Sequence, residues 1–279
     1  MNLTISIEKI DNSLLVELLR KLTKSFHKLD RDFYVIGATA RDIILQELAN
    51  TSSRRKTRDL DIAIAIPGWD TFEHVIKVLK ADGFKKDAQL HQRFYYNDYE
   101  LDIVPYGLIA KDDDQIYWPP EENIAMSVKG FDEVLKDAIT VSIGGEFNIK
   151  IASLHGLFLL KFNAWIDRHF STSKDAEDMS FILDNYCSAN ENRNFHTEVY
   201  NWNDFNPYVV GGYWLAFDLI SVLQTSQIRY YKDQIDKEIS KGEGSRLFNQ
   251  MLDNSCSLTF EQISKTWQTI SDVFKTGLS

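Results

Sequence analysis

The sequence predicts an α+β fold, in which a mixed or antiparallel sheet with helices is followed by a helical C-terminal domain. Short apolar strand segments in the first part of the chain are joined by tight turns, which favours hairpins. Helical periodicity separates some of these segments, and from Ser153 onward it replaces them. We therefore predict two domains, 1–150 and 151–279.

The first domain begins with a predicted helix over 11–29. Its leucines recur at helical spacing along one face, and Asn12 or Ser13 supplies the side-chain oxygen that caps a helix N-terminus. In chain order, the next predicted elements are a strand over 33–36, a helix over 38–49, a strand over 59–66 and a helix over 69–81. Pro67-Gly68 separates the last strand from the last helix.

Two hairpins complete the first domain. Asn97-Asp98 is a predicted turn between two strand segments, so the strand that carries Asp102 runs antiparallel to the one before it. The second predicted hairpin joins 139–143 to 147–151.

Two polar segments are predicted as loops. One is 111–122, whose run of acids from Asp112 to Asp114 is interpreted as a solvated turn, because consecutive loop residues point in different directions. The other is the asparagine-rich segment 190–206. The helices predicted for the second domain cover 153–168 and 173–187 and lie around 211–240 and 259–275.

The composition limits the function classes open to this chain. Hydrophobic residues make up 44% of the 279 residues, and no apolar run is long enough to span a membrane. The N-terminus lacks a secretory pattern, and two cysteines without zinc spacing form no disulfide framework, so we expect a cytoplasmic protein. A net charge of −10 argues against a surface that coats nucleic acid, although the basic segment 53–58 is either a polyphosphate or RNA contact or a solvated loop.

Three carboxylates on two predicted strands are the strongest sign of function. Asp59 and Asp61 point to the same side of their strand, because strand side chains alternate. Adjacent acids repel each other, and a divalent cation such as magnesium relieves this repulsion. If Asp102 lies on the adjacent strand, the three acids can hold two ions for phosphoryl or nucleotidyl transfer. The alternative is a pair of solvent-facing acids at a sheet edge.

A glycine turn precedes these acids. Gly37 follows the strand over 33–36 and opens the next helix, where the first backbone amides are available to bind phosphate. Thr39 adds a hydroxyl and Arg41 adds a fork of donors nearby.

The order of these motifs resembles the nucleotidyltransferase superfamily that includes DNA polymerase beta. The resemblance rests on Gly37-Ala38-Thr39-Ala40-Arg41, followed by Asp59-x-Asp61 and then Asp102. The family pattern begins with Gly-Gly or Gly-Ser, so Ala38 lacks the serine hydroxyl and Thr39 is the candidate substitute. The segment from Val35 to Asp42 also looks like the tRNA-end-adding and polyadenylating enzymes.

What this resemblance implies is a two-magnesium site. The β- and γ-phosphates of a nucleoside triphosphate would lie on the turn formed by Gly37, Ala38 and Thr39. Asp59, Asp61 and Asp102 would be the catalytic residues and the ligands of two Mg²⁺ ions. Attack of an acceptor hydroxyl on the α-phosphorus of the triphosphate would then release pyrophosphate.

A second resemblance covers the predicted helices after residue 153. Lys161, followed by Arg168 and then by Lys174-Asp175-Ala176-Glu177-Asp178, looks like a block of the abortive-infection nucleotidyltransferase toxins and their uncharacterised relatives. It implies that Lys161, Asp175 and Asp178 border the nucleotide and that the helical domain closes the nucleotide cleft.

The residues themselves leave alternatives open for this block. Asp175 and Asp178 share one helix face, where they orient Lys161 or Arg41, read a base, or simply form a surface pair. Lys161 is either a cation for the triphosphate or a lysine whose stem covers a core helix.

Three functions follow as hypotheses. The first is a magnesium-dependent nucleotidyltransferase acting on RNA, at the end of tRNA, in a toxin-like role with an antitoxin partner. The second is the same chemistry on a small molecule such as an aminoglycoside, or on a protein. The third is a non-catalytic nucleotide-binding regulator, against which the intact set of three carboxylates argues by resemblance.

Overall fold

The computed structural model describes residues 2–10, 12–51, 59–120, 122, 125–194, 199, 202, 204–253 and 258–278. The chain divides into two units, Met1–Ser153 and Leu154–Ser279.

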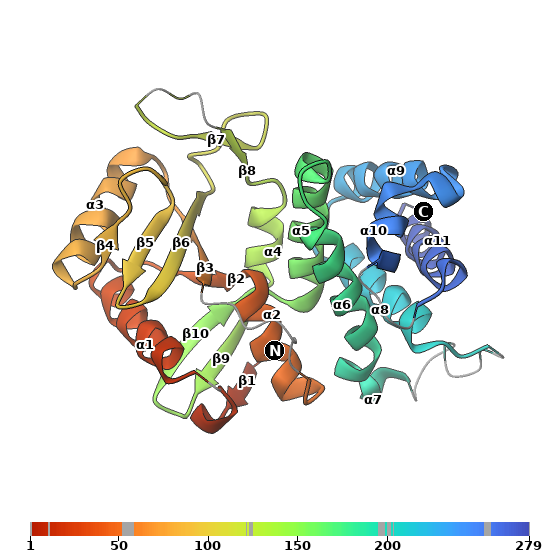
Figure 1. The fold of residues 1–279 in the computed structure, drawn as a ribbon, viewed down its shortest axis with the longest axis horizontal. Helices are drawn as coiled ribbons and strands as arrows, with labels where there is room; N and C mark the ends of the chain where they lie inside the picture. Colours follow the sequence, from red (N-terminus) through yellow and green to blue (C-terminus); the bar gives the residue numbers. More distant parts are fainter. Residues whose placement is uncertain are drawn as a thin grey trace. The chain divides into compact units, whose positions relative to one another are not determined.

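The described residues of the first unit form an eight-stranded sheet in the order β1-β9-β10-β2-β3-β6-β5-β4 (Figure 1). In that order, the strands are β1 (Asn2–Ile5), β9 (Ile139–Ile143), β10 (Phe147–Ile151), β2 (Tyr34–Ile36), β3 (Asp59–Ala65), β6 (Tyr99–Tyr106), β5 (Arg93–Tyr96) and β4 (Lys85–Lys86). The pairs β1 with β9, β10 with β2 and β3 with β6 are parallel, and the other four pairs are antiparallel. The predicted mixed sheet is confirmed.

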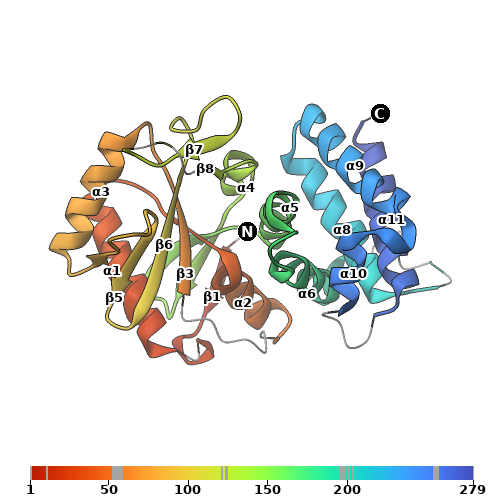
Figure 2. The ribbon, with the colours of Figure 1, turned by 45° about the horizontal axis from the view of Figure 1, so that its top comes forward.

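The three helices predicted for the first unit are observed, together with a short helix over 131–136 that was not predicted. The helices of the first unit are α1 (Ser13–Lys28), α2 (Gly37–Leu48), α3 (Trp69–Ala81) and α4 (Phe131–Lys136), with the 3-10 turn η1 (Ile7–Lys9). α1 and α3 lie along the same side of the sheet (Figure 2). Asn12 caps α1, as predicted, by accepting a hydrogen bond from the Leu15 amide.

The core of the first unit follows the alternation of its strands. Leu60, Ile62 and Ile64 of β3 are fully buried, as are Leu101 and Ile103 of β6. The residues between them point to the opposite side of the sheet, where the acids lie.

The predicted turn at Asn97-Asp98 joins β5 to β6, and the second predicted hairpin is β9 with β10. The loop predicted over 111–122 is partly wrong, since it contains β7 (Gln115–Tyr117), which pairs with β8 (Ala125–Ser127). This small hairpin forms because Ile116 and Trp118 bury their side chains, a signal too short to recognise in a polar segment. The acids at 112–114 are exposed, as expected for a solvated turn.

In the described residues of the second unit, all regular secondary structure is helical. Its elements are α5 (Leu154–Arg168), α6 (Lys174–Ala189), α7 (Glu191–Asn194), α8 (Pro207–Val222), α9 (Thr225–Ser240), η3 (Gly242–Gly244), α10 (Arg246–Asp253) and α11 (Phe260–Thr276). α7 lies in the segment predicted as a loop, which is a correction, and α10 adds an unpredicted short helix.

α8 packs closely against α6 and α11. A Cβ added to Gly211 would lie 2.7 Å from the Leu183 carbonyl, and one added to Gly212 would lie 2.6 Å from Thr266 Cγ2. The two glycines therefore allow the close contact that gives the unit its core. Among the described residues, no helix combines the length and apolar character that crossing a membrane requires.

Candidate active site

Asp59 and Asp61 lie on the same side of β3, at its N-terminal end. Both are half-buried, whereas Leu60 and Ile62 between and after them are fully buried. A separation of two strand residues puts the two acids about 6.6 Å apart along the strand. The local part of the predicted site is therefore a direct result of strand alternation.

Asp102 joins them from the neighbouring strand. β3 and β6 are parallel, and Asp61 is paired in register with Asp102, while Asp59 is paired with Glu100. Neighbouring strands are about 4.8 Å apart, so side chains at paired positions on one face are near neighbours. The condition stated for a three-carboxylate site, that Asp102 lies on the adjacent strand, is met.

Gly37 lies directly against Asp61. An ideal Cβ at Gly37 would be 2.3 Å from Asp61 Oδ2, so no side chain fits there. Gly37 also has a φ of +71°, in the left-handed region that favours glycine. The glycine turn and the carboxylates were predicted separately, and here they are in contact.

The rest of the turn is described by its own contacts. Ala38 lies half-buried in the first turn of α2, and Thr39 Oγ1 donates a hydrogen bond of 3.3 Å to the Asp59 carbonyl. Thr39 thus links the start of α2 to the start of β3. Arg41 is buried, and its Nε donates to Asp42 Oδ1 at 2.9 Å. Its phosphate contact stays a prediction.

Arg93 is a site residue that the sequence analysis missed. Its Nε and Nη2 each donate a 2.7 Å hydrogen bond to one oxygen of Asp102, and its Nη1 contacts Glu100. The hydrogen bonds to Asp102 raise the pKa of Arg93 above its ordinary value. The Arg93 guanidinium is therefore permanently charged.

A signal for Arg93 was present in the sequence. The two-residue turn at Asn97-Asp98 pairs Tyr96 with Tyr99, and counting outward from it pairs Arg93 with Asp102. The register of the predicted hairpin therefore already implied that Arg93 lies opposite Asp102.

The donor chemistry of this face fits magnesium, since Asp59, Asp61 and Asp102 offer hard carboxylate oxygens on one side of adjacent strands. Within the described ranges, however, no three His, Cys, Asp or Glu side chains converge to hold a metal ion. One physical reason is visible, because Arg93 engages both oxygens of Asp102. A cation at Asp102 has to share or displace that contact.

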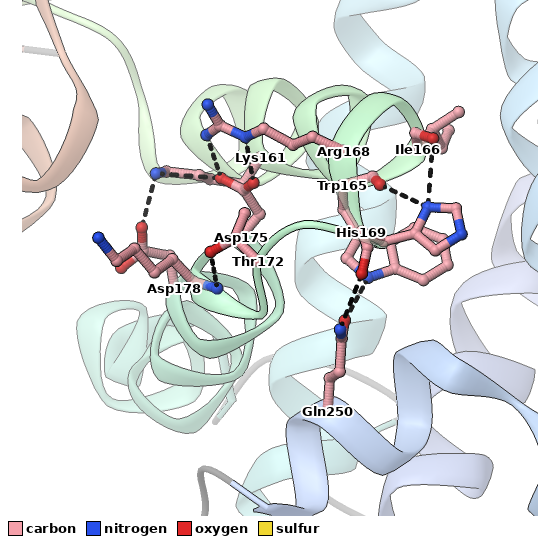
Figure 3. Close-up of polar contacts among 10 residues, drawn as sticks. Lys161, Trp165, Ile166, Arg168, His169, Thr172, Asp175, Asp178 and Gln250 are labelled. Carbon is pink, nitrogen blue, oxygen red and sulfur yellow. Dashed lines mark hydrogen bonds and ion pairs between the residues drawn. The ribbon is translucent and has the colours of Figure 1, made fainter.

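The second unit carries its own charged cluster (Figure 3). Lys161 Nζ lies 2.6 Å from Asp178 Oδ2 and 3.4 Å from Asp175 Oδ1. Arg168 donates from Nε and Nη2 to the two oxygens of Asp175, at 2.7 and 2.8 Å. Of the alternatives left open, contact of the two acids with Lys161 is the one observed.

Exposure separates the members of this cluster. The Asp175 side chain is 1% exposed, whereas Lys161 is 23% and Arg168 is 55% exposed. A buried carboxylate needs cations around it, so Asp175 acts as an anchor that fixes Lys161 and Arg168. Direct contact of Asp175 with a nucleotide stays a prediction that its burial disfavours.

The basic segment 53–58 lies wholly outside the described residues, which exclude 52–58. Its predicted contact with polyphosphate or RNA is therefore not addressed by the geometry above.

Comparisons with known proteins were made for the sequence and for the fold. No family model and no curated protein matches the sequence. The fold is similar to the solution structure of the antibiotic-resistance factor ANT(2″)-Ia, with 14% identity and a TM-score of 0.37 over 61% of this chain and 83% of that one. It is also similar to the crystal structure of ANT(2″)-Ia in complex with adenylyl-2″-tobramycin, with 13% identity and a TM-score of 0.40 over 66% of this chain and 100% of that one. Because the sequence identities and TM-scores are this low, the case for a function rests on the carboxylate face, which is formed by Asp59, Asp61 and Asp102.

Proposed function

We propose that this chain is a magnesium-dependent nucleotidyltransferase, which moves a nucleoside monophosphate from a triphosphate to an acceptor hydroxyl and releases pyrophosphate. The observation that carries the proposal is the contact between the Asp61 carboxylate and Gly37, with Asp102 in register beside Asp61. This contact supports the proposal because it brings the turn predicted to bind phosphate next to two of the predicted catalytic carboxylates.

Each part of this face has a proposed task. The first amides of α2, from Gly37 to Thr39, hold the β- and γ-phosphates, because the N-terminus of a helix attracts anions. Asp59, Asp61 and Asp102 would hold the two magnesium ions. Bound magnesium supplies neutralisation of the phosphate charge and activation of the acceptor hydroxyl. Thr39 keeps the turn and β3 together through the Asp59 carbonyl.

In the second unit, Asp178 and Asp175 hold the ammonium group of Lys161 in place. An oriented positive charge suits an anion, so contact of Lys161 with a triphosphate remains a proposal.

For the acceptor, we propose a cationic hydroxylated small molecule of the aminoglycoside kind. The strand face carries Glu100 in addition to Asp59, Asp61 and Asp102, and the chain has a net charge of −10. Such a face favours a polycationic acceptor over a polyanionic acceptor. This acceptor differs from RNA, the first hypothesis from the sequence, which depends on the basic segment 53–58.

A transfer assay tests both halves of the proposal. The protein is incubated with Mg²⁺, each labelled nucleoside triphosphate and one acceptor pool: an aminoglycoside panel, total tRNA, or no added acceptor. We expect label on an aminoglycoside with equimolar pyrophosphate. Label on tRNA, or on the protein itself, would replace the acceptor and keep the reaction.

Two variants control this assay. Asp61→Asn is expected to abolish transfer and leave the fold intact, whereas Asp112→Asn, in the exposed acidic turn, is expected to have no effect. Magnesium-dependent nucleotide binding by calorimetry without any transfer would favour the regulator hypothesis. Absence of both binding and transfer would refute the proposed function.

A further inference from the structure

Arg93 lies within the carboxylate face of the first unit. Arg93 stands on β5 opposite Asp102, and it contacts Glu100, the next residue along the same side of β6. Its fork covers both oxygens of Asp102 at 2.7 Å. One side chain thus compensates two acids that would otherwise repel each other and the neighbouring Asp61.

The contact is built into the sheet. Arg93 and Asp102 are cross-strand partners, so their backbones are held by the β5–β6 ladder. Both side chains are largely shielded, with 20% of Arg93 and 16% of Asp102 exposed. Partly buried acids at close range need a counter-charge at all times, including when no metal ion is bound.

We infer that Arg93 is a positioning residue that takes the place of a divalent cation at Asp102 until one binds. This inference rests on the proposed function, because it treats Asp102 as a cation ligand. When a cation arrives, Asp102 exchanges at least one hydrogen bond from Arg93 for the ion. Glu100 then keeps Arg93 beside the strand, so the pair can re-form when the ion leaves.

The consequence is that Arg93 lowers the cation affinity of the site and preserves its geometry without a cation. These two effects distinguish an arginine that replaces a divalent cation from an arginine in a merely structural ion pair. A structural pair would contribute the same stability with and without metal.

The test uses the full-length protein and Mn²⁺ as the probe, without nucleotide. Mn²⁺ binding is followed by electron paramagnetic resonance, and thermal unfolding is recorded in EDTA and in Mn²⁺. The variants are Arg93→Gln, which removes the charge, and Arg93→Lys, which keeps the charge and loses the fork. The matched control is Arg20→Gln, which removes the same charge from the pair at 2.5 Å between Arg20 on α1 and Glu146 in the turn from β9 to β10.

For Arg93→Gln we expect Mn²⁺ affinity to rise about tenfold, since a unit positive charge is removed a few ångströms from a divalent ion. Its unfolding temperature should fall in EDTA and recover in Mn²⁺. Arg93→Lys should show a smaller rise in affinity, and it provides the result if Arg93→Gln does not fold. Arg20→Gln should change neither quantity.

Unchanged or weaker Mn²⁺ binding in Arg93→Lys and in any folded Arg93→Gln would overturn the inference. If wild-type protein binds Mn²⁺, loses it in Asp61→Asn and is unaffected by the Arg93 variants, this inference fails and the proposed function stands. If wild-type protein and all variants bind no Mn²⁺, the metal assignment of the proposed function fails as well.

Discussion

Each unit of this protein holds an aspartate in the fork of an arginine, but only in the second unit do the two partners differ strongly in exposure. Arg93 binds Asp102 with hydrogen bonds of 2.7 Å, and Arg168 binds Asp175 with hydrogen bonds of 2.7 and 2.8 Å. In the first pair, the side chains are similarly shielded, at 20% and 16% exposed. In the second, Arg168 is 55% exposed and Asp175 is 1% exposed.

The difference in exposure indicates a different role for each carboxylate. Asp102 is paired in register with Asp61 on the neighbouring strand, and its side chain is still 16% exposed. Asp175 is enclosed by the helices of its unit, so its charge serves to hold Lys161 and Arg168 in fixed positions. The same kind of ion pair therefore holds a proposed cation ligand in the first unit and an anchoring carboxylate in the second.

The largest expected effect is on activity and comes from Asp102→Asn. Loss of a cation ligand should cost several kcal/mol of transition-state stabilisation, or about 10³-fold in transfer rate. The free energy of unfolding should change by only about 1–2 kcal/mol, because Arg93 keeps its contact with Glu100. Transfer kinetics and urea unfolding measure the two quantities. A fully active Asp102→Asn variant would show that Asp102 is not a cation ligand and would remove the proposed difference in role between Asp102 and Asp175.

The next effect is on stability and tests the anchor in the second unit. The double variant Lys161→Met/Arg168→Met removes both cations from the buried Asp175, which should lower the free energy of unfolding by about 3–5 kcal/mol. Adding Asp175→Asn to the double variant should restore most of this loss, since the uncompensated charge is then gone. Equal stability of the double and triple variants in urea unfolding would show that Asp175 is not an anchor.

A smaller effect concerns the turn that meets the carboxylate face. Gly37→Ala places a Cβ 2.3 Å from Asp61 Oδ2 and must move that carboxylate. A shift of about 1 Å at a reacting group costs about 10²-fold in rate. The matched control is Gly145→Ala, which has the same φ of +71° and open space around its Cβ.

Both glycine variants should lose about 1–2 kcal/mol of stability through the left-handed backbone alone. Only Gly37→Ala should lose transfer activity beyond what its stability explains. If both variants retain full transfer, the contact between Gly37 and Asp61 has no part in the reaction.

Local patterns in the sequence account for much of the fold. The predicted helix over 69–81 is α3 (Trp69–Ala81), and the predicted hairpin over 139–143 and 147–151 is β9 with β10. These elements are specified by periodicity and turn residues within a few positions of each other. β7 and α10 were missed because three to eight residues are too few for a period to stand out.

The sequence alone determined that Asp59 and Asp61 share one side of a strand and that Gly37 opens a helix, because both follow from the backbone geometry of neighbouring residues. Only the tertiary structure decided that Asp102 pairs with Asp61, that Asp61 lies against Gly37, and that Asp175 is buried. These contacts join residues far apart in the chain or depend on packing from several elements. Their free energy comes from strand pairing and burial across the whole unit, which no local pattern encodes.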